Sequence, residues 1–327
     1  MPRVLVTPSV LFNLPGTYSQ VLQAAGLEVV YPPAGANLFD EATLIQNLRG
    51  IDATLASTEP YSRRVLAATK LRAVARMGVG YDAVDVPAAT EHGVAVTITP
   101  GANEHSVAEL TIALLTGVYR GLPRRIDEVR SGKWTKQTLP RLWGQTIGLV
   151  GLGRIGKAVV PRANGLGLKV LGYDPFPDRD FAAKNNVELC SFDDLLARSD
   201  IVSLHLPNLP ETLNLINAQS LAKMKRGSVL INTARGSLVD EEALAAALQS
   251  GQLMGAGLDV FQTEPLPTSS PLLKFDNVLT TPHMAGLDHD SFEAMGRIAA
   301  ECVANLYQGR WPDGCVVNSG IREGWKW

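Results

Sequence analysis

The stretch TIGLVGLGRIGKAVVPRANGLGLKVLGYD, residues 146–174, decides the fold of this chain. It begins with an apolar run of strand length, Ile147 to Val150, which is followed directly by the glycine-rich letters GLGRIG. A segment with helical composition comes next, and a second apolar run, Lys169 to Tyr173, ends at an aspartate. A strand, a glycine turn, a helix, a strand and an acid within about thirty residues predict a βαβ unit that binds a dinucleotide.

Each of the three glycines in this unit has its own physical reason. Gly151 lets the chain turn sharply out of the strand, and Gly153 has no Cβ, so that backbone N–H groups can approach a pyrophosphate. Gly156 allows the helix to pack closely against the sheet. The unpaired N–H groups and the partial positive charge at the start of the helix then attract the anion.

Asp174, the acid at the end of the second strand, predicts which dinucleotide is bound. It lies 18 residues after Gly156, where its carboxylate can accept from both ribose hydroxyls and would repel a 2′-phosphate, so NAD is favoured over NADP. The letters from Gly151 to Lys157 also match the GxxxxGK of a phosphate-binding P-loop, but Ala158 lacks the hydroxyl with which such a loop binds Mg²⁺. The P-loop interpretation fails at its metal ligand, and no metal site is predicted.

Length and composition indicate a globular protein of two domains. The chain has 327 residues, 46% hydrophobic and 19% charged, with a net charge of −2 and no long charged run, which argues against nucleic-acid and membrane-surface binding. The three cysteines show no metal-ligand spacing and predict reduced thiols. The apolar run at the N-terminus is too short for a signal peptide or a membrane span, so we expect a cytoplasmic protein.

The first hundred residues alternate short β-rich segments with segments of helical spacing, which predicts an α/β fold with a mostly parallel sheet. Strands are expected at Val4–Thr7, Leu27–Tyr31, Ala53–Ser57, Ala73–Met77 and Val94–Thr97. Helices are expected at Tyr18–Ala25, Ala42–Arg49, Ser62–Thr69 and Val86–His92. Pro100 argues against continuation of the last strand and indicates a domain boundary near residue 100.

Two features near this boundary leave alternatives open. The turn Gly78-Val79-Gly80 follows a predicted strand, and it is either a site where backbone N–H groups meet an anionic ligand or an ordinary tight turn. An amphipathic helix is expected at Glu104–Arg120, capped by Asn103 or Ser106. We expect this helix to connect the two domains, with its apolar face used for core packing or for a dimer interface.

Three ionisable residues in the second half share one position, just beyond the C-terminal end of a predicted strand. Further strands are expected at Ile201–Leu206, Ser228–Asn232, Ala256–Val260 and Val278–Thr281, and helices at Glu241–Gln249, capped by Asp240, and at Ser291–Tyr307. Arg235, Glu264 and His283 follow the last three of these strands. Because ligands bind outside the carboxyl ends of parallel strands, we expect the three side chains to converge near the glycine turn.

This set of side chains suits hydride transfer to a carbonyl. The transfer leaves negative charge on the oxygen, and a histidine can donate the proton that neutralises it, or accept a proton in the reverse direction. A neighbouring carboxylate orients the imidazole, and an arginine can hold a substrate carboxylate through two parallel hydrogen bonds. By pattern alone His205, at the end of another strand, is a rival to His283, and structural roles for all of these residues stay open.

The chain resembles the D-isomer-specific 2-hydroxyacid dehydrogenases, including 3-phosphoglycerate dehydrogenase-like members. The resemblance runs over roughly residues 45–310 and is carried by GLGRIG with Asp174 and by the segments Gly78–Asp82, Gly101–Glu109, Met224–Gly236, Gly257–Phe261 with Glu264-Pro265, and Pro282-His283. It implies two Rossmann-like or flavodoxin-like α/β domains with parallel sheets. An NAD-binding domain, residues 101–286, would be inserted in a substrate domain made of residues 1–100 and 287–327. A homodimer is also implied.

The resemblance implies an NAD-dependent oxidoreductase that interconverts a D-2-hydroxyacid and its 2-oxoacid. Its catalytic set would be Arg235, Glu264 and His283, which favours His283 over His205. The backbone at Met77, Gly78, Val79 and Gly80 would bind the substrate carboxylate. Cofactor contacts are implied for His283 and for Gly151, Gly153, Arg154, Ile155, Gly156, Asp174, Pro207, Thr212, Thr233, Ala234, Asp259 and Gly286.

Departures from the family pattern bear on the substrate. Phosphoglycerate-type members typically carry an Arg-Ser pair after the third strand, and Ala56 stands at the position of that arginine, which argues against 3-phosphoglycerate. The regulatory C-terminal domain of some members is not expected here. Two alternatives are a non-enzymatic NAD(H)-sensing corepressor, since corepressors of this fold keep the same three ionisable residues, and an NADP-linked hydroxypyruvate or glyoxylate reductase, which Asp174 disfavours.

Overall fold

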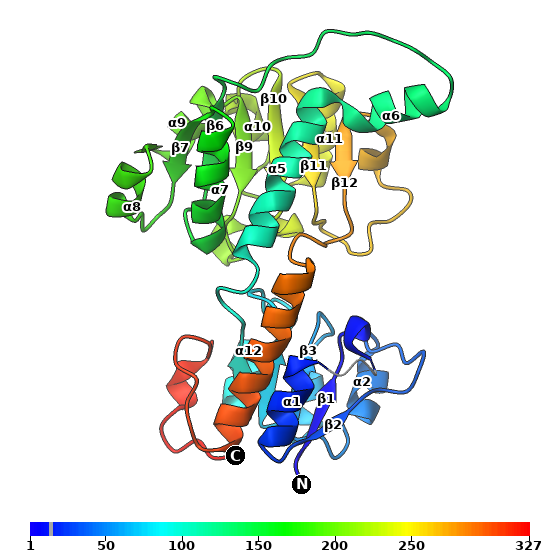
Figure 1. The fold of residues 1–327 in the computed structure, drawn as a ribbon, viewed down its shortest axis with the longest axis vertical. Coiled ribbons are helices and arrows are strands. Elements are labelled where there is room, and N and C mark those ends of the chain that lie inside the picture. The colour runs from blue at the N-terminus through cyan, green and yellow to red at the C-terminus, as the bar shows by residue number, and fades with distance from the viewer. Residues whose placement is uncertain (13–15) are drawn as a thin grey trace. The chain divides into compact units, whose positions relative to one another are not determined.

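The structure is a computed structural model that describes residues 1–12 and 16–327. The chain forms two compact units, and each is described here by itself (Figure 1). Unit 1 comprises Met1–Asn103 and Leu287–Trp327, and unit 2 comprises Glu104–Gly286. Among the described residues, no helix is both long and apolar enough to cross a membrane.

Unit 1 is built on a five-stranded parallel sheet in the order β2-β1-β3-β4-β5, which is the flavodoxin-like order. Its strands are β1 (Arg3–Val6), β2 (Glu28–Val30), β3 (Ala53–Ala56), β4 (Ala73–Arg76) and β5 (Ala95–Thr97). Parallel neighbours need a crossover, and helices of the same unit provide it. The loops that leave the carboxyl ends of β3 and β4 therefore lie at one edge of the sheet.

Helices cover both faces of this sheet because side chains alternate along each strand. Val4 and Val6 of β1 pack in the cluster with α1 and α12, whereas Leu5 packs in the cluster with α2, α3 and α4. The helices are α1 (Thr17–Ala24), α2 (Glu41–Asn47), α3 (Arg63–Ala67), α4 (Val86–Glu91) and α12 (His289–Tyr307). Because α12 lies beside α1 (Figure 1), the C-terminal segment completes a core that the first hundred residues begin.

Unit 2 contains a seven-stranded parallel sheet in the order β12-β11-β10-β9-β6-β7-β8. Its strands are β6 (Thr146–Val150), β7 (Lys169–Tyr173), β8 (Val187–Leu189), β9 (Ile201–Leu204), β10 (Ser228–Asn232), β11 (Leu253–Leu258) and β12 (Val278–Thr280). The chain winds outward from β6 to β8 and then crosses to β9 on the other side of β6. Such a reversal marks the crevice in which doubly wound sheets bind ligands at the carboxyl ends of their strands.

The helices of unit 2 also form two layers, and Figure 1 shows α5 and α7 side by side on one face of the sheet. Helices α9, α10 and α11 pack in the cluster on the other face. The helices are α5 (Glu104–Arg120), α6 (Leu122–Arg130), α7 (Arg154–Gly165), α8 (Arg179–Lys184), α9 (Phe192–Arg198), α10 (Ala218–Lys223) and α11 (Glu241–Gln249). Of these, α6 buries none of its residues.

The predicted α/β class with parallel sheets is confirmed, while several predicted segments need correction. The strand predicted at Ala256–Val260 runs from Leu253 to Leu258, because Gly255 and Gly257 hide its start in an apolar pattern. These glycines let α5 approach closely: a Cβ on Gly257 would lie 2.8 Å from Cβ of Leu114. Helix α6, helices α8 to α10 and strand β8 were not predicted, because their short apolar patterns are weak.

Two helix starts also differ from expectation. The final helix begins at His289 instead of Ser291, because Asp288 precedes it and its Oδ1 accepts the N–H of Ser291 at 2.8 Å. Ser106, one of the two expected caps of α5, lies inside that helix, and its hydroxyl donates to the carbonyl oxygen of Ala285 at 2.7 Å. The Ser106 side chain therefore ties α5 to the loop that follows β12.

Candidate active site

The glycine loop between β6 and α7 has tight contacts at two glycines and open space at the third. Gly151 has a φ of 101°, and a Cβ on Gly156 would lie 2.1 Å from the carbonyl oxygen of Gly151. Only glycine fits these two positions. A Cβ on Gly153 would meet nothing within 4 Å, so the folded protein does not itself require glycine there. The open space at the N-terminus of α7 fits a pyrophosphate that the backbone approaches closely.

Asp174 links the end of β7 to this loop. Its Oδ2 accepts the N–H of Leu152 at 2.8 Å, and its Oδ1 accepts the N–H of Phe176 at 2.8 Å. Each carboxylate oxygen can accept a second hydrogen bond, so both stay able to receive a ribose hydroxyl. The residue therefore positions the loop and fits the role of a ribose acceptor.

Arg235 follows β10, and the packing of Gly236 brings it beside the loop that follows β11. A Cβ on Gly236 would lie 1.9 Å from the carbonyl carbon of Phe261, so the backbone segments at these two residues are in direct contact. The carbonyl oxygen of Arg235 accepts from Nδ2 of Asn232 at 2.8 Å, and its Nη1 donates to the carbonyl oxygen of Ala234 at 2.6 Å. These bonds hold Arg235 at the carboxyl edge of the sheet, where its positive charge contributes to lowering the pKa of Glu264.

His283 and Glu264 form a hydrogen-bonded pair at the same edge. Nδ1 of His283 lies 2.7 Å from Oε2 of Glu264, and both side chains are partly exposed. The other oxygen, Oε1, accepts the N–H of Phe261 at 2.9 Å, which fixes the carboxylate. Since an ionised carboxylate only accepts, Nδ1 must carry the proton, and Nε2 is left to exchange one with a ligand.

The carboxylate of this pair is held in its charged form. Burial by itself would raise the pKa of Glu264, but the hydrogen bonds from His283 and Phe261 and the charges of His283 and Arg235 outweigh it, so the pKa lies below its ordinary value of 4.5. Glu264 is therefore ionised throughout the neutral range. It can orient the ring of His283 and stabilise positive charge on it.

Asp259 builds the loop that carries His283. It is fully buried, and its oxygens accept from the hydroxyl of Thr281 at 2.5 Å, from the N–H of Met284 at 2.9 Å and from the N–H of Ala285 at 2.9 Å. His283 itself has a φ of 51°, and its N–H donates to the carbonyl oxygen of Asp259 at 2.8 Å. The expected contact of Asp259 with the cofactor stays a prediction, and its contacts here are structural.

His205, the rival suggested by its position, lies in a different environment. Burial lowers its pKa to about 4, so the ring is neutral in the physiological range. Nε2 lies 2.9 Å from the hydroxyl of Ser203 on the same strand end, and within the described residues Nδ1 has no hydrogen-bond partner. The backbone of His205 lies against Gly151, where a Cβ would approach its carbonyl oxygen to 2.7 Å. These contacts favour a packing role beneath the glycine loop.

The other expected cofactor contacts lie on the same side of unit 2, after its strands. Thr233 is buried, and its hydroxyl lies 2.8 Å from that of Thr111 on α5. Thr212 donates to the carbonyl oxygen of Pro207 at 2.8 Å and so closes the loop after β9. Arg154 and Ile155 form the first turn of α7, Ala234 follows β10, and Gly286 ends unit 2. Their contacts with a cofactor stay predictions.

In unit 1 the loop after β4 contains Met77, Gly78, Val79 and Gly80, the expected substrate-binding residues. The N–H of Gly78 already donates to the hydroxyl of Thr99 at 2.9 Å, so it is not available as expected. The N–H groups of Val79 and Gly80 donate to no acceptor in the described part of the chain. Two of the backbone donors therefore fit an anion.

Arg76 and Thr99 organise this loop, and the sequence did not single them out. The Arg76 side chain donates to the carbonyl oxygens of Gly80 at 2.8 Å and Ala56 at 3.1 Å, and also to that of Ser57. It thereby joins the loops that follow β3 and β4. The sequence signal for Arg76 was a charged residue at the end of a predicted strand. Such a group needs several hydrogen-bond acceptors when it is buried, as Arg76 is.

Glu59 is a buried carboxylate in the loop after β3. Only 2% of it is exposed. Burial raises its pKa to about 7, although the backbone N–H groups of Glu59 and Ser57 and the charge of Arg76 act in the opposite direction. The carboxyl group therefore takes up a proton in the folded protein at a pH where the unfolded chain has lost it.

Replacing Glu59 with glutamine is expected to stabilise the protein at alkaline pH. The folded pKa exceeds the ordinary value of 4.5, so the native state loses stability as the pH rises from about 4.5 to 7. Relative to the native chain, Glu59→Gln should gain about 2 kcal/mol in free energy of unfolding between pH 5 and pH 8.5. Urea unfolding at both pH values measures this gain, and the exposed Glu323→Gln serves as control. Parallel pH dependence of all three proteins would contradict the assignment.

Comparisons with known proteins show the family of this chain. Residues 112–285 match the family described as D-isomer specific 2-hydroxyacid dehydrogenase, NAD binding domain. The chain is also 41% identical to a glyoxylate reductase of Korarchaeum cryptofilum over 287 residues. These residues cover 85% of this chain and 86% of the relative. The chain belongs to the D-isomer-specific 2-hydroxyacid dehydrogenase family. As in that family's NAD-binding domain, its cofactor is NAD.

Two other members of the family show how the likeness is distributed. A D-3-phosphoglycerate dehydrogenase of Mycobacterium leprae is 42% identical over 284 residues, which cover 86% of this chain but 52% of the relative, so this chain spans about half of that protein. The crystal structure of a D-lactate dehydrogenase from Aquifex aeolicus, complexed with NAD and lactic acid, superposes with a TM-score of 0.83. It is 29% identical and covers 96% of this chain and 98% of its own.

Proposed function

We propose that this chain catalyses the reversible reduction of a small, unphosphorylated 2-oxoacid to its D-2-hydroxyacid. The observation that carries the proposal is the 2.7 Å pair of His283 and Glu264, beside the charge of Arg235, in a unit that binds NAD. When bound, NAD gives or accepts the hydride. The family membership supports the reaction class, and the chemistry of the three side chains supports their roles.

In this proposal His283 is the acid and base of the reaction. With the Nδ1 proton held by Glu264, Nε2 donates a proton to the carbonyl oxygen of the substrate during reduction and takes it back during oxidation. Glu264 stays ionised because its pKa is lowered, so it balances the positive charge of the ring. The buried Asp259 supports this role because it holds the loop of His283 in place.

Arg235 and the loop after β4 are proposed to bind the substrate. The guanidinium of Arg235 can hold a carboxylate and polarise a neighbouring carbonyl. The N–H groups of Val79 and Gly80 are proposed as further donors to the substrate carboxylate, since they are not used within the described chain. This division leaves the selection of the substrate side chain to the loops of unit 1.

The loop after β3 supports a substrate without a phosphate. Residues 53–60 contain no lysine or arginine, and Ala56 is fully buried. Arg76, the cation beside this loop, directs its guanidinium to the carbonyl oxygens of Ala56, Ser57 and Met77. The loop therefore supplies no cation to pair with a phosphate, which would leave such a group without a partner.

A panel of 2-oxoacids, read by NADH absorbance, tests the proposal. Glyoxylate, pyruvate and hydroxypyruvate represent small substrates, and phosphohydroxypyruvate represents a phosphorylated one. We expect turnover of at least one small acid, with kcat/KM at least about tenfold above that of the phosphorylated acid. A preference for the phosphorylated acid would contradict only the argument that the loop after β3 offers no cation to a phosphate. Tight NADH binding without any turnover would contradict the proposed reaction.

Asp174 is expected to set the preference for NADH over NADPH. Replacing it with alanine removes the charge that would repel a 2′-phosphate, so the ratio of kcat/KM for the two cofactors should fall by about tenfold, or ~1.4 kcal/mol. The exposed Asp180→Ala on α8 makes the same change in net charge away from the strand end and should leave the ratio unchanged. An equal drop in both variants would show that only overall charge matters.

A homodimer formed through α6 is the proposed assembly. Leu122, Ile126 and Val129 are exposed at helical spacing on this helix, and Trp134 is exposed in the long segment that follows it (Figure 1). We expect Ile126→Asp to convert a particle of twice the chain mass into one of single mass in light scattering, because a charge would be buried. Arg124→Asp, which by helical spacing lies on the opposite side of the same helix, should leave the dimer intact. A native particle of single mass would contradict the proposal.

A further inference from the structure

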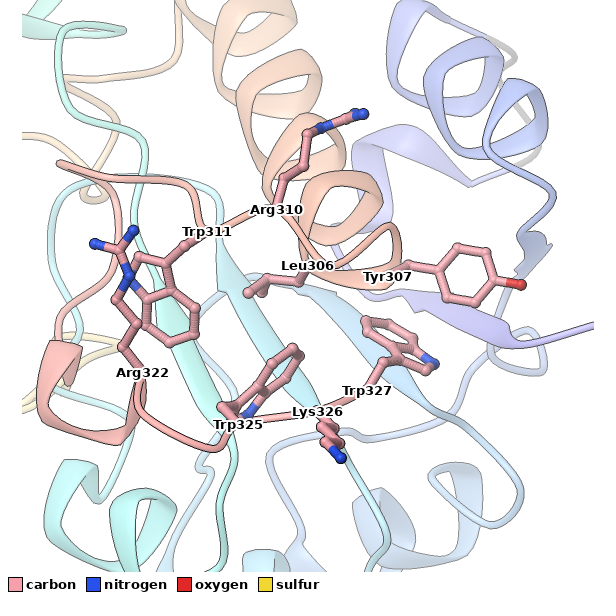
Figure 2. Close-up of a pocket in the computed structure, with 9 residues that line it drawn as sticks. Leu306, Tyr307, Arg310, Trp311, Arg322, Trp325, Lys326 and Trp327 are labelled. Atoms are coloured by element: carbon pink, nitrogen blue, oxygen red, sulfur yellow. The ribbon is translucent and has the colours of Figure 1, made fainter.

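A pocket lies in unit 1, at the C-terminal end of α12. It has a volume of about 390 Å³, within the range of small-molecule sites, and its aromatic lining consists of Tyr307, Trp311, Trp325 and Trp327. Figure 2 shows these rings arranged around Leu306, with Trp311 and Trp325 on one side and Tyr307 and Trp327 on the other. The proposed reaction uses none of these residues.

The aromatic walls of this pocket are held in fixed orientations. The rings of Trp311 and Trp325 meet edge to face with their centres 5.8 Å apart, and those of Tyr307 and Trp327 meet in the same way at 5.3 Å. Nε1 of Trp325 donates to the carbonyl oxygen of Gly93 at 2.9 Å, and the guanidinium of Arg72 lies over its ring at 5.8 Å. Each ring is half-buried, so it presents both an anchored side and an accessible one.

The charged residues that line the pocket are all cations. Arg310, Arg322 and Lys326 contribute to its lining, and no aspartate or glutamate does. Arg322 is partly neutralised by Asp313, to which its Nη1 donates at 2.9 Å. Arg310 donates to the neutral side chains of Asn305 and Gln308. Lys326 forms no ion pair within 4.0 Å with any residue that the structure describes. Figure 2 places Arg310 and Lys326 at the edges, which suits contact with the charged end of a ligand.

We propose that this pocket binds a small planar aromatic anion, such as an aromatic carboxylate. Flat rings offer a face or an edge for stacking to the planar part, and the surrounding cations attract the charged part. Aliphatic anions would leave the aromatic walls without a partner, and neutral aromatics would leave the cations unused. The pocket shares no residue with the proposed cofactor and substrate sites, because all of its residues lie in the C-terminal segment of unit 1.

Three ligands test this proposal in titrations followed by ¹⁹F NMR of protein labelled with 5-fluorotryptophan. Indole-3-acetate carries the ring and the charge, indole carries only the ring, and acetate carries only the charge. Three of the five tryptophans line the pocket, while Trp134 and Trp143 belong to unit 2. We expect indole-3-acetate to shift only the resonances of Trp311, Trp325 and Trp327, with a Kd on the order of 1 mM, as usual for so small a ligand.

Lys326→Gln should weaken the binding of indole-3-acetate about threefold to tenfold and leave that of indole unchanged, because it removes only a charge. Lys274→Gln, a matched change in unit 2, should alter neither. Equal affinities for indole and indole-3-acetate would overturn the preference for an anion. Shifts of all five tryptophan resonances, or of none, would overturn the pocket itself. NADH turnover is not the readout, so failure here is distinguishable from failure of the proposed reaction.

Discussion

Replacing His283 with alanine is expected to lower kcat for 2-oxoacid reduction by about 10²- to 10⁴-fold, with little change in the Kd of NADH. The size follows from the loss of a positioned general acid, which contributes that much in other enzymes. The ring has the arrangement that this role requires, since Nδ1 is paired with Glu264 at 2.7 Å and Nε2 is left for the substrate. Steady-state rates and NADH fluorescence titration measure the two quantities separately.

His92→Ala is the matched control for this experiment. His92 is exposed at the C-terminal end of α4, so its removal changes the histidine content without touching the proposed site. Unchanged turnover in His283→Ala would reject the acid–base assignment. A similar loss in both variants would point to a general effect of removing histidine.

Glu264→Gln extends the same prediction to pH. The pKa of Glu264 lies below 4.5, so its charge is present from about pH 5 upward and is lost only as the pH falls through that lowered value. In the glutamine variant the protonated ring of His283 loses its countercharge. The alkaline limb of the pH profile for reduction should therefore move to lower pH, which a merely structural role of Glu264 would not cause.

Replacing Gly153 with alanine is expected to weaken NADH binding by at least about tenfold without destabilising the free protein. A Cβ at this position meets no protein atom within 4 Å, so the fold tolerates it. The same methyl group would occupy the space through which the backbone approaches the pyrophosphate. Fluorescence titration with NADH measures the affinity, and thermal unfolding of the free protein measures its stability.

Two glycines on the same helix provide the comparison. A Cβ on Gly165, at the other end of α7, also meets nothing within 4 Å, so Gly165→Ala should preserve both affinity and stability. Gly156→Ala should instead lower stability, since its Cβ would lie 2.1 Å from the carbonyl oxygen of Gly151. Equal NADH affinities in Gly153→Ala and the native chain would reject the proposed position of the pyrophosphate.

Patterns that repeat along the chain were enough to predict the architecture of this protein. Alternating strand and helix periods predicted the parallel α/β sheets, and GLGRIG with Asp174 predicted a dinucleotide site. Local physics explains the success with the fold class, because glycine at a tight turn and apolar residues at regular spacing express their preferences within a few residues. The same rule explains the misses at α6 and β8, which are short and carry weak apolar patterns.

The sequence by itself therefore determined the fold class, and it offered a glycine turn for NAD and three candidate side chains that each follow a strand. Only the tertiary structure decided which contacts these side chains make. It paired His283 with Glu264, placed His205 against the hydroxyl of Ser203, and showed that Thr99 already accepts the N–H of Gly78. It also revealed that Arg76 joins two loops of unit 1. These contacts join residues far apart in the chain, and they depend on distances of a few tenths of an ångström, which no spacing of letters encodes.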